Sequence, residues 1–263
     1  MEKHKLQSLV KRVISALVMI PVVVGALFLG EPWSNFLFLL IGAFLAWEWA
    51  SMVPSLKKEA YAVAYTLVAT VSAFFEPGLV WALLVVTTFL IIFFVSRKEN
   101  EKFLLRLGVL YISLGVASLS WLNMMFGFLG IMWFFLMVWS VDVGGYVFGT
   151  TIKGPKLAPR ISPNKTWAGL IGGMLLSAAM SALYIWYFNA LNLWTFFCPL
   201  AAAIALVAQI GDLVESAIKR HLGLKDSSNL IPGHGGVFDR VDGLIFAAPI
   251  FFVCWQVFYM LSE

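Results

Sequence analysis

The stretch LIFAAPIFFVCWQVFYML, Leu244–Leu261, contains no charged residue. It is close to the length of about 20 apolar residues that a helix needs to cross a bilayer. Directly before it, Pro232–Gly243 reads PGHGGVFDRVDG, with a histidine between glycines, then two aspartates and an arginine. An apolar helix that follows charged and flexible residues predicts a membrane segment with a polar site at one of its ends.

Composition points to the same class of protein for the whole chain. Hydrophobic residues make up 61% of the sequence and charged residues only 12%, which excludes an ordinary soluble globular protein. Apolar stretches of spanning length lie at 13–30, 34–52, 60–76, 79–96, 107–125, 130–149, 167–187, 194–211 and 243–261. We predict an all-α integral membrane protein with about nine transmembrane helices in a single domain over 1–263. The first stretch lacks a convincing cleavage site, so we expect a retained helix rather than a signal peptide.

Positive charges indicate the orientation of the chain in the membrane. All 18 lysines and arginines lie before the first stretch or in every second gap after it, and the gaps between carry none. Because positive charge near the ends of spans is held on the cytoplasmic side, we expect the N-terminus inside and the C-terminus outside.

The aspartates are the first candidates for a functional site. All of them follow residue 140 and lie at or just outside the cytoplasmic ends of predicted helices: Asp142, Asp212, Asp226, Asp239 and Asp242. An ionisable group at membrane depth is costly and is by default a functional hypothesis. In GDLVESAIKR, residues 211–220, helical spacing puts Asp212, Glu215, Ser216 and Lys219 on one face. The alternative interpretation of that face is a solvated helix end with a Glu215–Lys219 ion pair.

The segment before the last helix combines carboxylates with a flexible backbone. Asp239 and Asp242 are three residues apart, so their side chains share a helix face. Paired carboxylates suit a hard cation such as magnesium, which also takes substrate phosphates as ligands. Gly235 and Gly236 allow the backbone to approach a ligand closely, and their N–H groups can hold a phosphate. His234 is either an ordinary loop histidine or a substrate contact, and its neighbours favour the second reading.

A basic loop precedes the helix predicted at 167–187. It reads TIKGPKLAPRISPNKT, residues 151–166, and contains no acid. Its prolines and glycines predict a structured loop rather than a helix. Lys165 at its end is placed to meet a phosphate. Asp142, in WSVDVGGYVFG, has small neighbours that let another helix or a ligand approach.

Three of these segments resemble a known family. SAIKRHLGLKDSSNLIPGHGGVFDRVD, Ser216–Asp242, resembles the signature of the phosphatidate cytidylyltransferases, or CDP-diacylglycerol synthases, at every specified position. VDVGGY and KLAPRISPNKTWAG are similar to further blocks of that family, so the resemblance covers residues 140–245. Thr150 and Thr151 stand where the family has a basic residue, and Ala168 where a Glu or Gln is common. Roles of those positions are therefore not carried over.

The resemblance implies an activity and its cofactors. CTP would react with phosphatidic acid to give CDP-diacylglycerol and pyrophosphate for phospholipid biosynthesis, with magnesium and with potassium as a second cation. It also implies a nine-span fold, a homodimer, and Asp212 and Asp239 as metal-binding residues. Residues 127–263 then form the catalytic half, and 1–126 supply helices without a motif. We expect a multi-pass protein of the inner (plasma) membrane with its active site facing the cytoplasm, and no nucleic-acid partner.

Charge neutralisation is the main chemical task for such a reaction, because two highly negative reactants must meet. Cations held by Asp212, Asp239 and Asp242 would bridge the nucleotide phosphates. The residues expected to act in catalysis are Asp212, Lys219, Arg220, Lys225, Asp226, His234, Asp239, Arg240 and Asp242. Those expected to bind substrate are Asp142, Ser162, Lys165, Gly235 and Gly236.

Two other functions remain open from the sequence. A CTP-dependent lipid kinase needs the same kind of basic, metal-binding pocket, but it would transfer the γ-phosphate to a polyprenyl or phytyl hydroxyl. A transporter or channel would use the buried acids as an ion path. It predicts polar residues through to the opposite face, where the stretches are almost wholly apolar. The long signature disfavours the first alternative, and this apolar face disfavours the second.

Overall fold

The computed structural model describes residues 2–76, 78–189, 194–231 and 235–262. The chain forms two compact units. The first comprises residues 1–128 together with 221–241, and the second comprises residues 129–220 together with 242–263. The segment 221–241 therefore belongs with the N-terminal helices, although it comes much later in the sequence.

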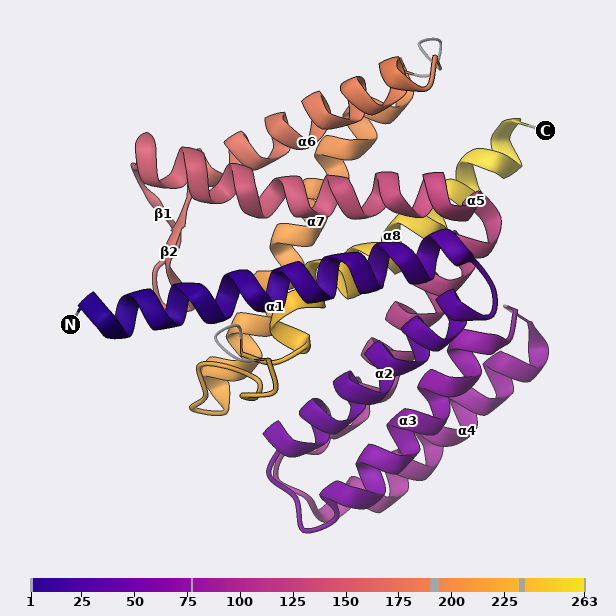
Figure 1. Cartoon of the computed structure of the whole chain (residues 1–263). Helices are drawn as coiled ribbons and strands as arrows, with labels where there is room; N and C mark the ends of the chain where they lie inside the picture. Colours follow the sequence, from indigo (N-terminus) through magenta and orange to yellow (C-terminus); the bar gives the residue numbers. More distant parts are fainter. Residues whose placement is uncertain (1, 77, 190–193, 232–234, 263) are drawn as a thin grey trace. The chain divides into compact units, whose positions relative to one another are not determined.

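The first unit is helical. Its elements are α1 (Glu2–Leu29), α2 (Trp33–Met52), α3 (Lys58–Phe74), α4 (Leu79–Val95), the short 3-10 helix η1 (Ser96–Lys98) and the first part of α5 (Lys102–Thr151). Helices α2 and α3 lie side by side (Figure 1). Gly42 permits this approach, because a Cβ at its position would lie 2.6 Å from Ala69 Cβ. Trp49 of α2 is fully buried and donates its indole N–H to Leu104 O at 3.0 Å, so its one polar atom is satisfied.

Helix α5 is broken near its middle. Gly127 has φ 61° and ψ −165°, a non-helical conformation that a residue with a side chain rarely adopts. The break separates two helical segments that match the predicted stretches 107–125 and 130–149. It also lies next to the boundary between the two units, after residue 128.

The second unit contains the rest of the helices and a small hairpin. Its elements are the second part of α5, β1 (Lys156–Ala158), β2 (Ser162–Thr166), α6 (Trp167–Tyr187), α7 (Trp194–His221) and most of α8 (Phe238–Ser262). The rings of Phe134 and Phe251 stack at 5.4 Å in its core. Trp133 Nε1 donates to Ser181 Oγ at 3.0 Å, which pairs two polar groups in apolar surroundings.

Helices α5 and α6 approach closely at a pair of glycines. A Cβ at Gly144 would lie 2.7 Å from Gly173 Cα and 3.0 Å from Gly172 O. Because these neighbours are backbone atoms, no side chain can rotate to make room. Small residues that let helix backbones meet are the usual packing device of membrane helices.

The predicted membrane class agrees with the structure. Each of the nine predicted stretches is α-helical except for one or two residues at the end of some of them, and six helices of the described part are long and apolar enough to cross a bilayer. Large apolar side chains are widely exposed, among them Leu79 at 75%, Leu175 at 64% and Met260 at 71%. A soluble monomer rarely exposes so much apolar surface. The number of spans and their orientation stay predictions.

The segments that carry the predicted site residues also agree with the sequence-based predictions. Helix α7 continues through Asp212 to His221, in agreement with the helical spacing assumed for residues 211–220, and α8 begins at Phe238 so that Asp239 lies in its first turn. The basic loop contains an antiparallel hairpin, with Lys156 opposite Thr166 and Ala158 opposite Ser162. The fold is thus helical except for this hairpin and one isolated bridge within the described ranges.

The glycine contact between α5 and α6 gives a direct test. We expect Gly144→Ala to lower the melting temperature of the detergent-solubilised protein, because overpacking against backbone costs about 1–3 kcal/mol. Gly145→Ala is the matched control, since a Cβ there would lie 4.0 Å from its nearest neighbour, Gly169 O. That variant should be neutral or slightly stabilised. Equal melting temperatures for the two variants would contradict the close contact.

Candidate active site

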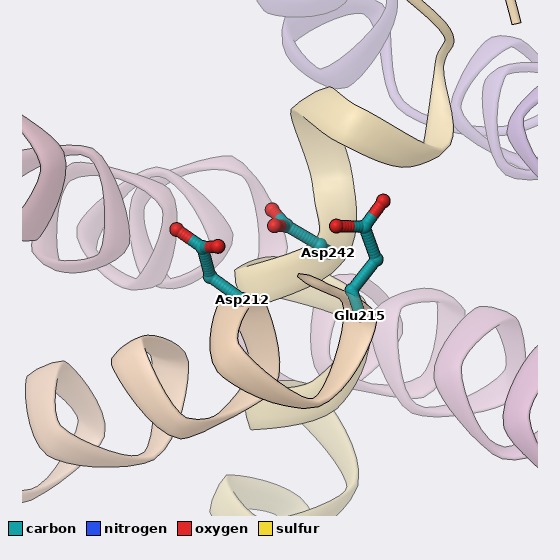
Figure 2. Close-up of side chains that lie close together, drawn as sticks. All are labelled: Asp212, Glu215 and Asp242. Carbon is teal, nitrogen blue, oxygen red and sulfur yellow. The ribbon is translucent and has the colours of Figure 1, made fainter. Parts of the chain in front are cut away.

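Three carboxylates gather where α7 meets α8. Asp212 and Glu215 come from one turn of α7 and Asp242 from α8, and one oxygen of each lies within 4.8 Å of the others. Figure 2 shows the three side chains beside one another. Glu215 is buried, whereas Asp212 and Asp242 are partly exposed. We call these three residues the acidic cluster.

A glycine brings the two helices of the acidic cluster together. A Cβ at Gly211 would lie 2.5 Å from Phe246 Cβ and 3.2 Å from Asp242 O. The backbones of α7 and α8 therefore approach more closely than a larger residue would allow. Because Gly211 directly precedes Asp212, this contact sets the distance between the carboxylates of Asp212 and Asp242.

Two lysines balance part of the negative charge. Lys165 Nζ forms an ion pair with Asp212 Oδ2, and Lys219 Nζ lies 2.7 Å from Glu215 Oε2. The Glu215 side chain is only 1% exposed and that of Lys219 is 10% exposed. The Glu215–Lys219 ion pair of the alternative interpretation is therefore present, but it is buried rather than solvated. Ser216 Oγ donates to Asp212 Oδ1 at 3.2 Å, which completes the predicted face.

The hairpin places Lys165. Lys165 is the penultimate residue of β2, and Thr166 after it caps α6 by accepting a hydrogen bond from Gly169 N at 3.0 Å. At the other end of β2, Arg220 Nε donates to Ile161 O at 3.3 Å. The hairpin is thus fixed to α6 at one end and to α7 at the other. Lys165 and Asp142 both act electrostatically on Asp242, so both predicted residues lie near the acidic cluster.

Asp239 is held by a different set of groups in the first unit. Its carboxylate accepts hydrogen bonds from Gly236 N at 2.8 Å, from Ser227 Oγ at 3.1 Å and from Ser227 N at 3.1 and 3.2 Å. Gly235 has φ 83°, and a Cβ there would lie 2.5 Å from Asp239 Oδ2. The glycines therefore bring the backbone close to Asp239, and their predicted role toward a ligand stays a prediction.

Glu48 of α2 was missed by the sequence analysis. Its side chain is 0% exposed, and it accepts hydrogen bonds from the loop that joins α7 to α8, residues 222–237, and from the first residue of α8. The signal was present, because Glu48 is a single acid within the apolar stretch FLAWEWASM. An acid in such a stretch is by default a functional hypothesis.

The remaining predicted site residues lie at the surface or outside the described ranges. Lys225, Asp226 and Arg240 are exposed, and Ser162 is partly exposed at the start of β2. His234 falls in 232–234, outside the described residues. Their predicted roles stay predictions.

The donor set of the acidic cluster fits a hard cation. Three carboxylates offer only oxygen ligands, which magnesium prefers, and substrate phosphates can supply further oxygens. Formally, three carboxylates and the two paired lysines sum to a charge of −1. A residual negative charge beside positive side chains can take one cation and still attract anionic phosphates nearby.

The buried ion pair gives a second test. We expect Lys219→Met to destabilise the protein by about 3–5 kcal/mol, because Glu215 would lose the positive charge that compensates its burial. Thermal unfolding in detergent measures the change. Lys58→Met is the matched control, since the Lys58–Glu59 pair is 3.9 Å long and exposed. An equally small effect of both substitutions would contradict the importance of the buried pair.

The sequence is similar to known proteins along nearly its whole length. The profile described as the cytidylyltransferase family matches residues 10–258. The phosphatidate cytidylyltransferase of Brucella suis is 33% identical over 259 residues, which cover 96% of this chain and 95% of the relative. The protein of the same name from Rickettsia bellii is 35% identical, and the alignment covers 95% of this chain and 92% of the relative. The one from Pseudomonas aeruginosa is 36% identical, and the alignment covers 92% of this chain and 94% of the relative. The chain therefore belongs to the cytidylyltransferase family.

Proposed function

We propose that this protein transfers the cytidylyl group of CTP to phosphatidic acid, giving CDP-diacylglycerol and pyrophosphate for phospholipid biosynthesis. The observation that carries the proposal is the acidic cluster with its two lysines, in a chain similar along nearly its whole length to proteins named phosphatidate cytidylyltransferase. A phosphate oxygen of the lipid attacks the α-phosphorus of CTP. The bond between the α-phosphorus and its bridging oxygen breaks, and pyrophosphate leaves.

This reaction needs no nucleophile from the protein, because the lipid phosphate is already an anion. Its difficulty is electrostatic, since two anions must come within bonding distance and charge then builds on the leaving pyrophosphate. Fixed positive groups aimed at that charge lower the barrier most effectively in a site shielded from water. Lys165 and Lys219 have side chains only 19% and 10% exposed and fit this task.

Magnesium is the cation that we propose for the acidic cluster. When bound, it would neutralise phosphate charge and act as a Lewis acid toward the phosphoryl oxygens. Asp212, Glu215 and Asp242 would hold it, and Ser216 orients Asp212 through its hydroxyl. Asp239, matched by the family resemblance, stays a predicted ligand, and potassium is proposed as a second cation.

Lys165 has a second task within this proposal. Its ion pair with Asp212 keeps the ammonium beside the carboxylate cluster, and the hairpin fixes its backbone at both ends. An ammonium group is a compact donor that can exchange one oxygen partner for another. We propose that Lys165 exchanges Asp212 for a CTP phosphate oxygen when the nucleotide arrives. Arg220 supports this exchange by holding the hairpin rather than by contacting phosphate.

A membrane setting matches the lipid substrate. The acyl chains stay among apolar helices while the charged headgroup reaches the carboxylates and lysines. We propose that the protein lies in the inner membrane with this site toward cytoplasmic CTP, as the positive-charge pattern predicts. A homodimer is proposed on the family resemblance alone.

Label transfer tests the proposed reaction directly. Purified protein in detergent with phosphatidic acid and magnesium should move label from α-labelled CTP into lipid and none from γ-labelled CTP. We expect Asp212→Asn to lower the rate at least about 100-fold, the scale of removing one major electrostatic group from an active site. The control Glu59→Gln changes an exposed carboxylate outside the acidic cluster and should leave the rate unaltered.

Three results would contradict the proposal. Label that enters lipid only from the γ-position would make this protein a lipid kinase. No transfer from either position would favour a transporter. An Asp212→Asn rate equal to that of Glu59→Gln would remove the acidic cluster from the mechanism even if the reaction itself were confirmed.

A further inference from the structure

Glu48 combines complete burial with a complete set of donors. Its side chain is 0% exposed within helix α2, where an uncompensated carboxylate would be very costly. Two serine hydroxyls and two backbone N–H groups point at it. A carboxylate accepts about four hydrogen bonds. Three of these donors face Glu48 alone, and the fourth, the Ser227 hydroxyl, lies equally near Asp239.

The donors are shared evenly between the two oxygens. Oε1 accepts from Ser228 Oγ at 2.6 Å and from Val237 N at 2.9 Å. Oε2 accepts from Phe238 N at 2.7 Å and from Ser227 Oγ at 3.2 Å. Each oxygen therefore faces one backbone N–H, which can only donate. A glutamine of the same shape would point its amide NH₂ at one of these N–H groups in either orientation, and no rotation of the side chain relieves that clash.

The four donors come from two parts of the connection between α7 and α8. Ser227 and Ser228 lie in its first half, Val237 is the residue before α8, and Phe238 is the first residue of α8. One side chain thus joins these two parts and pairs an N–H group at the start of a helix, where a negative charge is favourable. The ring of Phe238 packs edge-on against Trp49, the residue after Glu48, at 5.6 Å. Phe238 is therefore held both by the hydrogen bond to Glu48 and by the ring contact with Trp49.

Ser227 connects Glu48 to Asp239. Its hydroxyl lies 3.2 Å from Glu48 Oε2 and 3.1 Å from Asp239 Oδ2, but it has only one hydrogen to donate. Its backbone N–H also points at Asp239. Gly236 packs into the same place, because a Cβ there would overlap Ser227 Oγ and lie 2.5 Å from Glu48 Oε1. The position of Asp239 therefore depends on the Glu48 contacts through Ser227 and Gly236.

We propose that Glu48 is a positioning residue for the nucleotide site. It fixes the loop so that Asp239 stands ready for a cation that binds the phosphates of CTP, and the backbone N–H group of Gly235 for a phosphate oxygen. This proposal rests on the proposed function, in which Asp239 is a predicted metal ligand of the nucleotide site. It assigns a task to helix α2, which carries none of the three sequence motifs described above.

The first experiment compares steady-state kinetics of two isosteric variants. We expect Glu48→Gln to raise KM for CTP and the magnesium concentration for half-maximal rate by about tenfold, the scale of one lost hydrogen bond to a charged group. KM for phosphatidic acid should change less than about twofold, since no acyl-chain contact is altered. Glu59→Gln, the same change at an exposed residue, should match the unmodified protein.

A smaller substitution tests the contribution of a single donor to one oxygen of Glu48. Ser228→Ala removes one donor and leaves Val237 N on the same oxygen, so its effect on KM for CTP should be weaker than that of Glu48→Gln. Ser34→Ala is its control, because Ser34 is also buried in α2 and its hydroxyl makes no hydrogen bond within the described part of the chain. The Ser34→Ala variant should be unaltered.

Two readouts do not depend on turnover. Hydrogen exchange should be faster in Glu48→Gln at the amides of Ser227, Val237 and Phe238, and unchanged along the interior of α2. CTP binding without lipid should weaken by the same factor as KM. If Glu48→Gln lowered only the melting temperature, or lowered kcat alone with KM for CTP unaltered, the positioning role would be wrong. If the unmodified protein transferred no label, the proposed function would fail, and the exchange result would still decide whether Glu48 holds the loop.

Discussion

The need to give every buried carboxylate a partner governs both units of this protein. An acid among apolar helices loses its hydration, and it is tolerated only with cations or hydrogen-bond donors nearby. The second unit supplies the ammonium groups of Lys165 and Lys219 to the acidic cluster. The first unit supplies serine hydroxyls and backbone N–H groups to Glu48 and Asp239. The partners of these acids are therefore as specific as the acids themselves.

Lysine partners and backbone N–H partners differ in how easily they can leave a carboxylate. A lysine side chain is long and flexible, so it can leave a carboxylate for a phosphate oxygen at small cost in geometry. A backbone N–H is fixed by the fold and cannot turn away without moving the chain. The cluster neutralised by lysines thus suits exchange of partners during a reaction, and the carboxylate surrounded by backbone donors suits a permanent support. Glu48 and Asp212 are both acids near the signature residues, yet we infer opposite tasks for them from their surroundings.

The sequence predicted the helices well because apolar length is a strong signal in membrane proteins. It also predicted the shared face of Asp212, Glu215, Ser216 and Lys219, since helical spacing alone determines it. It did not predict that the Glu215–Lys219 pair is buried, because burial depends on which helices cover that face. Glu48 was missed for a similar reason: its partners are residues 227, 228, 237 and 238, and no local pattern connects segments so far apart. The hairpin was predicted only as a loop, because its strands are too short to show alternation.

Gly211 shows how a residue without a functional group can be as constrained as a ligand. Any side chain at this position would push α8 away at Phe246 and at the backbone of Asp242. The separation of the carboxylates would grow, and the geometry proposed for cation binding would be lost although every acid was still present. In a mutational scan scored by growth, substitutions at positions 211 and 212 would therefore both be rejected, although for unrelated reasons. Growth alone would not distinguish the two positions, whereas measuring both metal affinity and the spacing of α7 and α8 would.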